Sequence, residues 1–240
     1  MATIKQKIGK IVKSGLPFSS EAFDILRLEF KTFRLRLGDE INPVRIVKLR
    51  KLKKSKNISL NVGAGPFGEE GWVNLDSSPL KNVTLAMDCR KRLPFVDNSV
   101  ARIRCEHFLE HLDYMEEAYP FLKECHRAMI SGAILRIVVP DVPAYLHAFQ
   151  ENTAESWARI GINIKNKKAW PTPMHVLNHV FRQDGEHKFG YDFETLKLML
   201  TEIGFQNIKR MRFGSSADPL LTRDLENHRK KSLYVECEKP

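Results

Sequence analysis

A glycine-rich turn and two acidic residues stand at matching places, each directly after a short apolar segment. Ile58–Val62 leads into Gly63-Ala64-Gly65, and the next two apolar segments end at Asp76 and Asp88. Glycine lets the backbone turn tightly and approach a ligand closely. A carboxylate after the second segment can accept both hydroxyls of a ribose, and one after the third can accept the amino group of an adenine. The pattern predicts a site for a ligand that carries both groups.

The distance between the turn and the first acid narrows the choice of ligand. In glycine-rich dinucleotide sites the ribose-binding acid follows the motif by about 20 residues. Here Asp76 follows Gly65 by 11 positions, so the helix that ordinarily fills this gap is very short or absent. The spacing disfavours an NAD-dependent dehydrogenase and weakens any pyrophosphate site at a helix N-terminus.

Four further polar residues are candidates for ligand contact or acid–base chemistry. Glu106 and His107 end the apolar segment Val100–Cys105 and are candidate ligand contacts, with a solvated loop as the alternative. His111 and His187 are candidate general bases, because histidine titrates near neutral pH and can take a proton from a hydroxyl. A structural role is the alternative for each histidine.

No metal site is expected from the sequence. His175 and His179 have the i, i+4 spacing that suits a metal on a helix, but no third ligand is evident. The four cysteines are Cys89, Cys105, Cys125 and Cys237. Their wide spacing argues against a zinc ribbon and fits a reducing cytosol.

Strands and helices alternate from residue 57 onward. The expected strands are 58–62, 72–75, 83–87, 100–105, 133–139, 205–213 and 232–238, and the expected helices are 113–129 and 193–203. This alternation is typical of a mostly parallel, doubly wound α/β sheet. Ligands of such sheets bind beyond the carboxyl ends of the strands, where the strand order reverses. Residues 150–190 lack clear periodicity and form an expected insertion.

Six segments follow one another in a fixed order. They are Asn61-Val62-Gly63-Ala64-Gly65, Val73-Asn74-Leu75-Asp76, Asp88-Cys89 with Leu93-Pro94-Phe95, Leu109-Glu110-His111-Leu112, Leu135–Asp141, and Tyr191 with Thr195-Leu196 and Ile203-Gly204-Phe205. Over about residues 57–240 this series resembles the class I S-adenosylmethionine-dependent methyltransferases, most closely the type 11 methyltransferase domain.

The resemblance implies a Rossmann-like, seven-stranded, mostly parallel sheet and S-adenosyl-L-methionine as the cofactor. The residues that it places at the cofactor are Asn61, Gly63, Ala64, Gly65, Asp76, Asp88, Cys89, Glu106 and His107. Asp76 matches the ribose-binding acid, and Asp88-Cys89 matches the adenine side. S-adenosyl-L-methionine has no pyrophosphate. Its binding therefore depends less on a helix N-terminus after the first strand than the binding of a dinucleotide does.

The positive charge of the chain is confined to its first part. The 240 residues carry a formal net charge of +10. Residues 1–56 hold 15 Lys and Arg against 5 Asp and Glu, whereas residues 57–240 hold 24 of each. We therefore expect a basic helical N-terminal extension over 1–56 and a charge-balanced methyltransferase domain over 57–240.

The basic extension has three interpretations. Amphipathic basic helices bind anionic membrane surfaces, and a polyanion such as RNA is a second possible partner. The apolar stripe from Phe23 to Leu37, with Ser20 as helix cap and Gly38 as helix end, favours packing on the domain or on a second subunit. Few aromatic side chains interleave the basic residues of 1–14 and 44–56, so nucleic acid is less favoured there.

Composition is that of an ordinary soluble globular protein, with 42% hydrophobic and 28% charged residues. No apolar run reaches the ~18–20 residues that span a bilayer, and early lysines argue against a cleaved signal peptide. We expect a cytoplasmic enzyme, alternatively peripheral at the membrane, that O-methylates a small molecule or a glycan. The alternatives are an RNA or tRNA methyltransferase that uses the basic arm and a non-catalytic cofactor-binding scaffold at a membrane surface.

Overall fold

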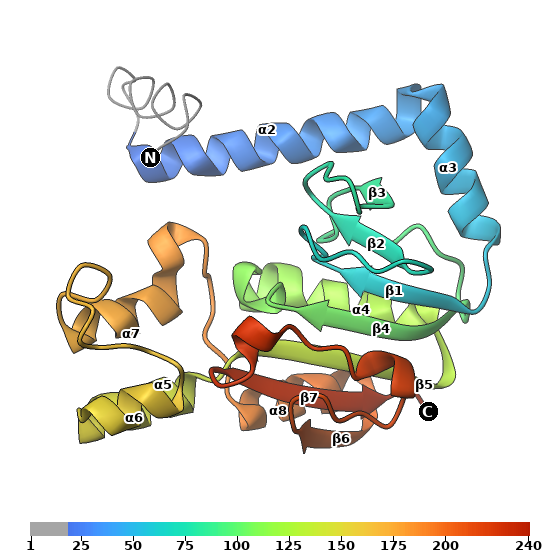
Figure 1. Cartoon of the computed structure of the whole chain (residues 1–240). Coiled ribbons are helices and arrows are strands. Elements are labelled where there is room, and N and C mark those ends of the chain that lie inside the picture. Colours follow the sequence, from blue (N-terminus) through green and yellow to red (C-terminus); the bar gives the residue numbers. More distant parts are fainter. Residues whose placement is uncertain (1–18) are drawn as a thin grey trace. The chain divides into compact units, whose positions relative to one another are not determined.

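The computed structural model describes residues 19–240, which divide into two compact units after Ile46 (Figure 1). The expected amphipathic segment 1–14 lies outside the described residues. The helices are α2 Ser20–Ile41, α3 Pro43–Lys54, α4 Tyr119–Ala128, α5 Val142–Glu151, α6 Ala154–Arg159, α7 Pro173–Arg182 and α8 Phe193–Ile203. Short turns of other helix types are η1 Leu109–His111, η2 Tyr114–Ala118, η3 Gln183–Gly185, η4 Pro219–Leu221 and η5 Glu226–His228.

The N-terminal unit consists chiefly of the helix α2. Its N-cap is Ser19, whose hydroxyl accepts a hydrogen bond from the Ala22 amide at 3.1 Å, so the expected cap at Ser20 was one residue late. The helix also continues through Gly38 to Ile41, and the expected end at Gly38 was wrong. A glycine inside a helix costs only about 1 kcal/mol, which the surrounding turns can offset.

The second unit is built on a seven-stranded sheet. The strands are β1 Ile58–Val62, β2 Val73–Asp76, β3 Leu85–Ala86, β4 Val100–Glu106, β5 Met129–Pro140, β6 Gln206–Met211 and β7 Ser232–Glu238. Their order is β3-β2-β1-β4-β5-β7-β6, and β7 alone runs antiparallel to its neighbours β5 and β6 (Figure 1). This confirms the Rossmann-like, mostly parallel sheet expected from the sequence.

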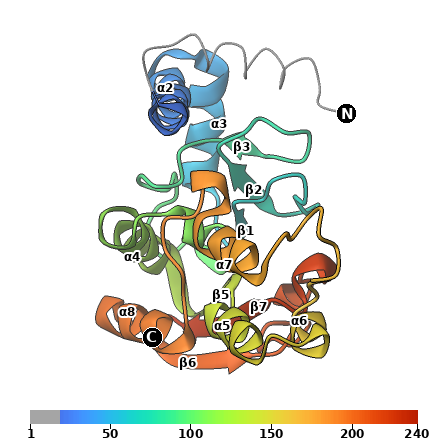
Figure 2. The ribbon, with the colours of Figure 1, turned by 90° about the vertical axis from the view of Figure 1, so that its left-hand side faces the viewer.

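Helices α4 and α8 cover one face of the sheet (Figure 2). Asp192 begins α8 by accepting the Thr195 amide at 2.8 Å, and Gly204 ends it in the left-handed conformation at φ +105°. The two helices bury apolar side chains such as Phe121 and Leu200 against the sheet, in the larger of two hydrophobic clusters. That cluster fixes the carboxyl ends of the parallel strands.

The opposite face, over β4, β5 and β7, is covered by residues 212–231, the connection from β6 to β7 (Figure 2). Three strand arginines bind this segment. Arg136 pairs with Asp224 and Glu236 at 2.6 and 2.7 Å. We call Arg102, Arg104 and Arg136 with their acidic partners the arginine network. The other two ion pairs of the arginine network are Arg102–Asp218 and Arg104–Glu69.

No helix forms between β1 and β2, as the short spacing predicted. Asn74 holds this connection instead: its amide side chain accepts from the Glu69 amide at 3.0 Å and donates to the Glu69 carbonyl at 2.8 Å. These bonds replace the backbone hydrogen bonds that a helix would have supplied. The loop that follows the glycine turn is therefore ordered without a helix.

Residues 142–182 form the helices α5, α6 and α7, which pack around the buried Trp157 as a second hydrophobic cluster. The sequence did not predict them, because short helices separated by loops leave too few turns for a periodic pattern. Thr153 and Ser156 cap α6 reciprocally, which fixes its start. None of the helices in residues 19–240 combines the length and apolar composition that crossing a bilayer requires.

Candidate functional site

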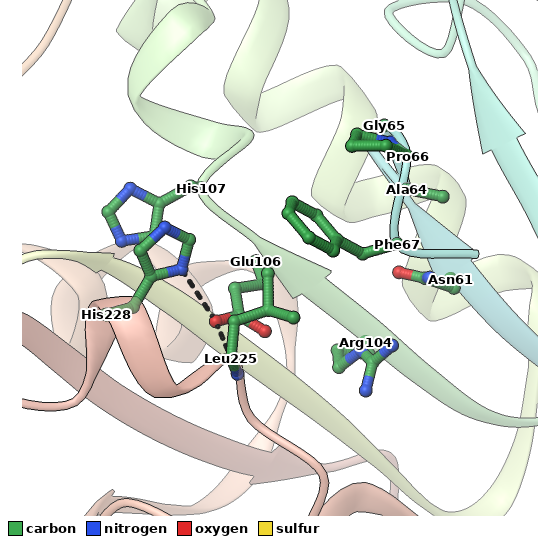
Figure 3. A pocket seen from close by; sticks show the side chains of 11 residues that line it. Asn61, Ala64, Gly65, Pro66, Phe67, Arg104, Glu106, His107, Leu225 and His228 are labelled. Atoms are coloured by element: carbon green, nitrogen blue, oxygen red, sulfur yellow. Dashed lines mark hydrogen bonds and ion pairs between the residues drawn. The ribbon is translucent and has the colours of Figure 1, made fainter. Parts of the chain in front are cut away.

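A pocket opens beyond the carboxyl ends of β1 and β4 (Figure 3). Because β2 lies on one side of β1 and β4 on the other, this is the point where the strand order reverses and where ligands of open α/β sheets bind. Its lining residues are Asn61, Gly63, Ala64, Gly65, Pro66, Phe67, Arg104, Glu106, His107, Leu225 and His228. Six of them, from the turn after β1 and the end of β4, were predicted from the sequence.

The two glycines of the turn differ in what surrounds them. Gly63 has φ +70°, and a Cβ on it would lie 2.7 Å from the Cβ of Phe108, so a larger residue does not fit. Gly65 has φ +49°, and a Cβ there would meet nothing within 4 Å. Gly63 is therefore required by the fold, whereas Gly65 faces space that a ligand can use.

Asp76 ends β2 and connects it to the glycine turn. Its Oδ2 accepts a hydrogen bond from the Gly65 amide at 2.9 Å, and its Oδ1 accepts one from the Ser78 amide at 2.7 Å. Each carboxylate oxygen has a second lone pair. The carboxylate is thus held in place beside the turn while it can still accept two hydroxyl groups.

Asp76, Asp88 and Cys89 are not among the side chains that line this pocket. Asp88 is buried, and both of its oxygens bind Arg90, at 2.9 Å and 3.1 Å. Cys89 lies in the larger hydrophobic cluster, where burial raises the pKa of its thiol. Cys89 lies near enough to Asp76 that this carboxylate also helps to raise the pKa of the thiol. The contact of Asp88 and Cys89 with a cofactor stays a prediction.

Glu106 lies at the centre of the pocket wall (Figure 3). Its Oε1 accepts from the Leu225 amide at 3.2 Å and lies 2.8 Å from Nδ1 of His228. Its Oε2 is buried and has no hydrogen-bond partner within the described part of the chain. A buried carboxylate oxygen without a donor is costly, so a ligand donor at this place would be favoured.

His107 follows Glu106 in a left-handed backbone conformation, φ +49°, which is uncommon for residues other than glycine. Its Nε2 lies 2.8 Å from the Ser232 hydroxyl, and its ring stacks on His228 with a centroid distance of 3.7 Å. Strained backbone of this kind persists where the surroundings hold it, often at functional sites.

Arg104 is a pocket residue that the sequence analysis missed. Its guanidinium binds Glu69 and donates to the Arg223 carbonyl at 2.7 Å. Arg102, Arg104 and Glu106 alternate along β4 and so point to one face of the sheet. That charged alternation was visible in the sequence. Leu225 and His228 had no comparable pattern, because they lie in the irregular connection before β7.

His111 and His187 come together from distant parts of the chain. Their ring centroids are 4.9 Å apart. Nδ1 of His187 lies 2.7 Å from the Val180 carbonyl, and Nδ1 of His111 lies 3.1 Å from the Glu186 carbonyl. Burial lowers the pKa of His187 below its usual 6.5, so its imidazole is neutral at pH 7. The pairing supports both as candidate bases.

Glu110, which the sequence analysis quoted only within a motif, lies beside these two histidines. It is 1% exposed, and neither of its carboxylate oxygens has an aligned hydrogen-bond donor among the described residues. Nδ1 of His107 lies 3.0 Å from its Oε1, an ion-pair distance. Burial alone would raise the pKa of Glu110, but His107 and His111 outweigh it and the pKa lies below its usual range. We call Glu110, His111 and His187 the Glu110 cluster.

No protein-family profile matches the sequence, and no curated protein matches it. Among solved structures, a SAM-dependent methyltransferase from Archaeoglobus fulgidus is 17% identical over 86% of this chain and 100% of its own, with TM-score 0.48. One from Aquifex aeolicus is 16% identical over 87% and 98%, with TM-score 0.42. Haemonchus contortus phosphoethanolamine N-methyltransferase 2, solved with S-adenosyl-L-methionine, is 11% identical over 81% and 52%, with TM-score 0.44.

With identities of 11–17% and TM-scores of 0.42–0.48, these similarities carry no conclusion about the activity of this chain. The type 11 assignment stays a prediction.

Proposed function

We propose that the second unit is an S-adenosylmethionine-dependent methyltransferase. The observation that carries this proposal is the bond between Asp76 and the Gly65 amide at the reversal of strand order. The bond holds a carboxylate that can accept the two hydroxyls of a ribose next to an open turn, at the place where ligands of such sheets bind. When bound, this cofactor supplies an electrophilic methyl group on a sulfonium.

The other end of the cofactor carries a carboxylate and an ammonium group. Arg104 and Glu106, two positions apart on one face of β4, offer the opposite charges within the same pocket. The Glu106 Oε2 has a free lone pair for an ammonium donor, and Arg104 has N–H donors beyond those on the Nη1 that binds Glu69 and Arg223. These two residues supply the contacts that a helix N-terminus after β1 would otherwise have made.

We further propose that the acceptor is a small molecule or a glycan and that methylation occurs on oxygen. The Glu110 cluster borders the pocket through His107, and a neutral imidazole can take the proton of a hydroxyl. The helices α6 and α7 lie within residues 150–190, the insertion that we expect to shape the acceptor pocket. Methyl transfer is an in-line displacement, so the main task of these residues is alignment.

Thermal melting with S-adenosylmethionine or its demethylated product tests the cofactor. A ligand at 100 times its Kd stabilises a protein by about 2.7 kcal/mol, which raises Tm by several degrees in a chain of this size. Asp76→Ala should lose most of this shift, and Asp97→Ala is the matched control because Asp97 pairs with Arg127 away from the pocket. Absence of a shift with either ligand at millimolar concentration would overturn the proposal.

A further inference from the structure

The Glu110 cluster unites two segments that are 76 residues apart in sequence. Glu110 and His111 lie in η1, after β4, and His187 lies between η3 and α8. The Lys188 amide donates to the Glu110 carbonyl at 2.8 Å, and the Phe189 amide donates to the same oxygen at 3.3 Å. The backbone therefore fixes the two segments against each other independently of the side chains.

Both histidines are oriented by backbone carbonyls. A ring nitrogen that faces a carbonyl oxygen must carry the proton, so Nδ1 donates to Val180 in His187 and to Glu186 in His111. In a neutral imidazole the other nitrogen, Nε2, then has a free lone pair. Histidines that ligate metals almost always donate their second N–H in this way.

The acceptors of the cluster have one ion-pair neighbour, since Nδ1 of His107 lies 3.0 Å from Oε1 of Glu110, but no aligned hydrogen-bond donor in the described part of the chain. Nε2 of His187 and both oxygens of Glu110 are buried without a hydrogen-bond partner among residues 19–240. Such groups are rare in native proteins because each loses its hydration without compensation. Three lone-pair donors that converge in a buried place are better satisfied by a cation than by one another. One ligand atom from each of the three residues lies within 4.8 Å of the others.

We propose that Glu110, His111 and His187 bind one divalent transition-metal ion, through a carboxylate oxygen and the two Nε2 atoms. Two imidazoles and one carboxylate suit zinc, cobalt, manganese or iron, whereas magnesium and calcium prefer oxygen ligands alone. Ligands around a tetrahedral ion lie about 3.4 Å apart, so the side chains would close by at most about 1.4 Å from their separation of up to 4.8 Å. The partly exposed His111 can supply this movement.

Three protein ligands leave a coordination position open, as in catalytic rather than structural metal sites. On the proposed function, this position would hold the acceptor oxygen and lower the pKa of its hydroxyl, so that the proton is released to water. With an ion bound, the two histidines would act as ligands and not as the base. The side chain of His107 lies between the proposed ion site and the cofactor pocket, because it contacts Glu110 and also lines that pocket. This part of the inference rests on the methyltransferase proposal, whereas metal binding itself does not.

Titration of the chelator-treated full chain with Co²⁺, followed by visible absorption, tests the metal site. We expect one ion per chain with the intense bands of a low-symmetry site. Glu110→Gln, His111→Asn and His187→Asn should each weaken binding at least tenfold. Asparagine keeps a donor near the Nδ1 position and removes Nε2, so the carbonyl bonds that hold each segment can persist.

His175→Asn and His179→Asn are the matched controls, because this exposed pair on α7 has metal-like spacing without a third ligand in the cluster. Cobalt binding should be unchanged in both. Binding that is absent from the wild type, or that disappears in the controls but persists in His111→Asn, would overturn the metal site. Since the titration needs no cofactor, a positive thermal shift with S-adenosylmethionine would leave the methyltransferase proposal standing in that event.

Discussion

The arginine network and the Glu110 cluster both bury charge, but they differ in how that charge is matched. Arg136 is fully buried, and its guanidinium makes five hydrogen bonds: two to Asp224, one to Glu236 and two to backbone carbonyls. In the Glu110 cluster the buried carboxylate has no aligned donor among the described residues. A satisfied network stabilises a fold, whereas unsatisfied acceptors indicate a place for a ligand.

Loss of Arg136 should give the largest effect on stability. Arg136→Met leaves Asp224 and Glu236 buried without their cation, which costs about 3–5 kcal/mol of unfolding free energy. Denaturant unfolding measures this. Arg159→Met removes an exposed pair with Glu151 and should cost at most about 1 kcal/mol. Equal losses in both variants would mean that burial does not distinguish the two pairs.

Loss of a histidine from the Glu110 cluster should instead reduce activity. His187→Asn is expected to lower kcat/KM about 100-fold, or about 2.7 kcal/mol, because it removes the candidate base or ligand. Methyl-transfer assays with the cofactor at saturation measure this, with His175→Asn as the control. If His187→Asn has a much lower Tm than the wild type but a normal kcat/KM, His187 contributes to stability and not to catalysis.

Asp76 is intermediate between the arginine network and the Glu110 cluster. Its carboxylate oxygens accept hydrogen bonds from backbone amides and can still accept further ones from a ligand. Asp76→Ala should weaken cofactor binding more than tenfold, or about 1.4 kcal/mol, through loss of the ribose contact and of the Gly65 bond. Calorimetric titration measures the affinity. Affinity equal to that of the wild type would refute the ribose role.

The smallest expected effect is on the pH dependence of stability. Burial, helped by the charges of His111 and His107, holds the pKa of His187 below 6.5 despite the Val180 carbonyl and Glu110. The unfolded chain then binds a proton more readily than the folded chain, so stability is lost as pH falls below about 6.5. Tm measured from pH 7.5 to 5.5 should fall less steeply for His187→Asn than for the wild type or His179→Asn. Parallel curves would contradict this assignment.

The sequence predicted the elements that have strong local patterns. Strand β1, helix α8 and strand β7 were expected at their observed bounds, because apolar periodicity and caps mark them clearly. The turn glycines, Glu106 and His107 line the pocket and Asp76 is bonded to Gly65, as expected from the meeting of parallel strand ends at one edge of a sheet. Their contacts with a cofactor stay predictions.

Features that depend on long-range contacts were missed. His228 reaches Glu106 from 122 positions away, and nothing in the local sequence indicates that contact. Glu110 was overlooked because its role depends on the distant His187 and on the lack of aligned hydrogen-bond donors for its carboxylate among the described residues. Lack of partners is a property of packing, which no local pattern records.

The wall that residues 225–232 add to the pocket also affects how the protein folds. Contacts such as those of Glu106 with His228 and of His107 with Ser232 close loops of more than 120 residues. Contacts between such distant residues slow folding, because the entropy of closing the loop is lost before the contact forms. The pocket is therefore completed only when β7 has entered the sheet between β5 and β6. Recovery of ligand binding during refolding should accordingly lag behind the recovery of helical signal.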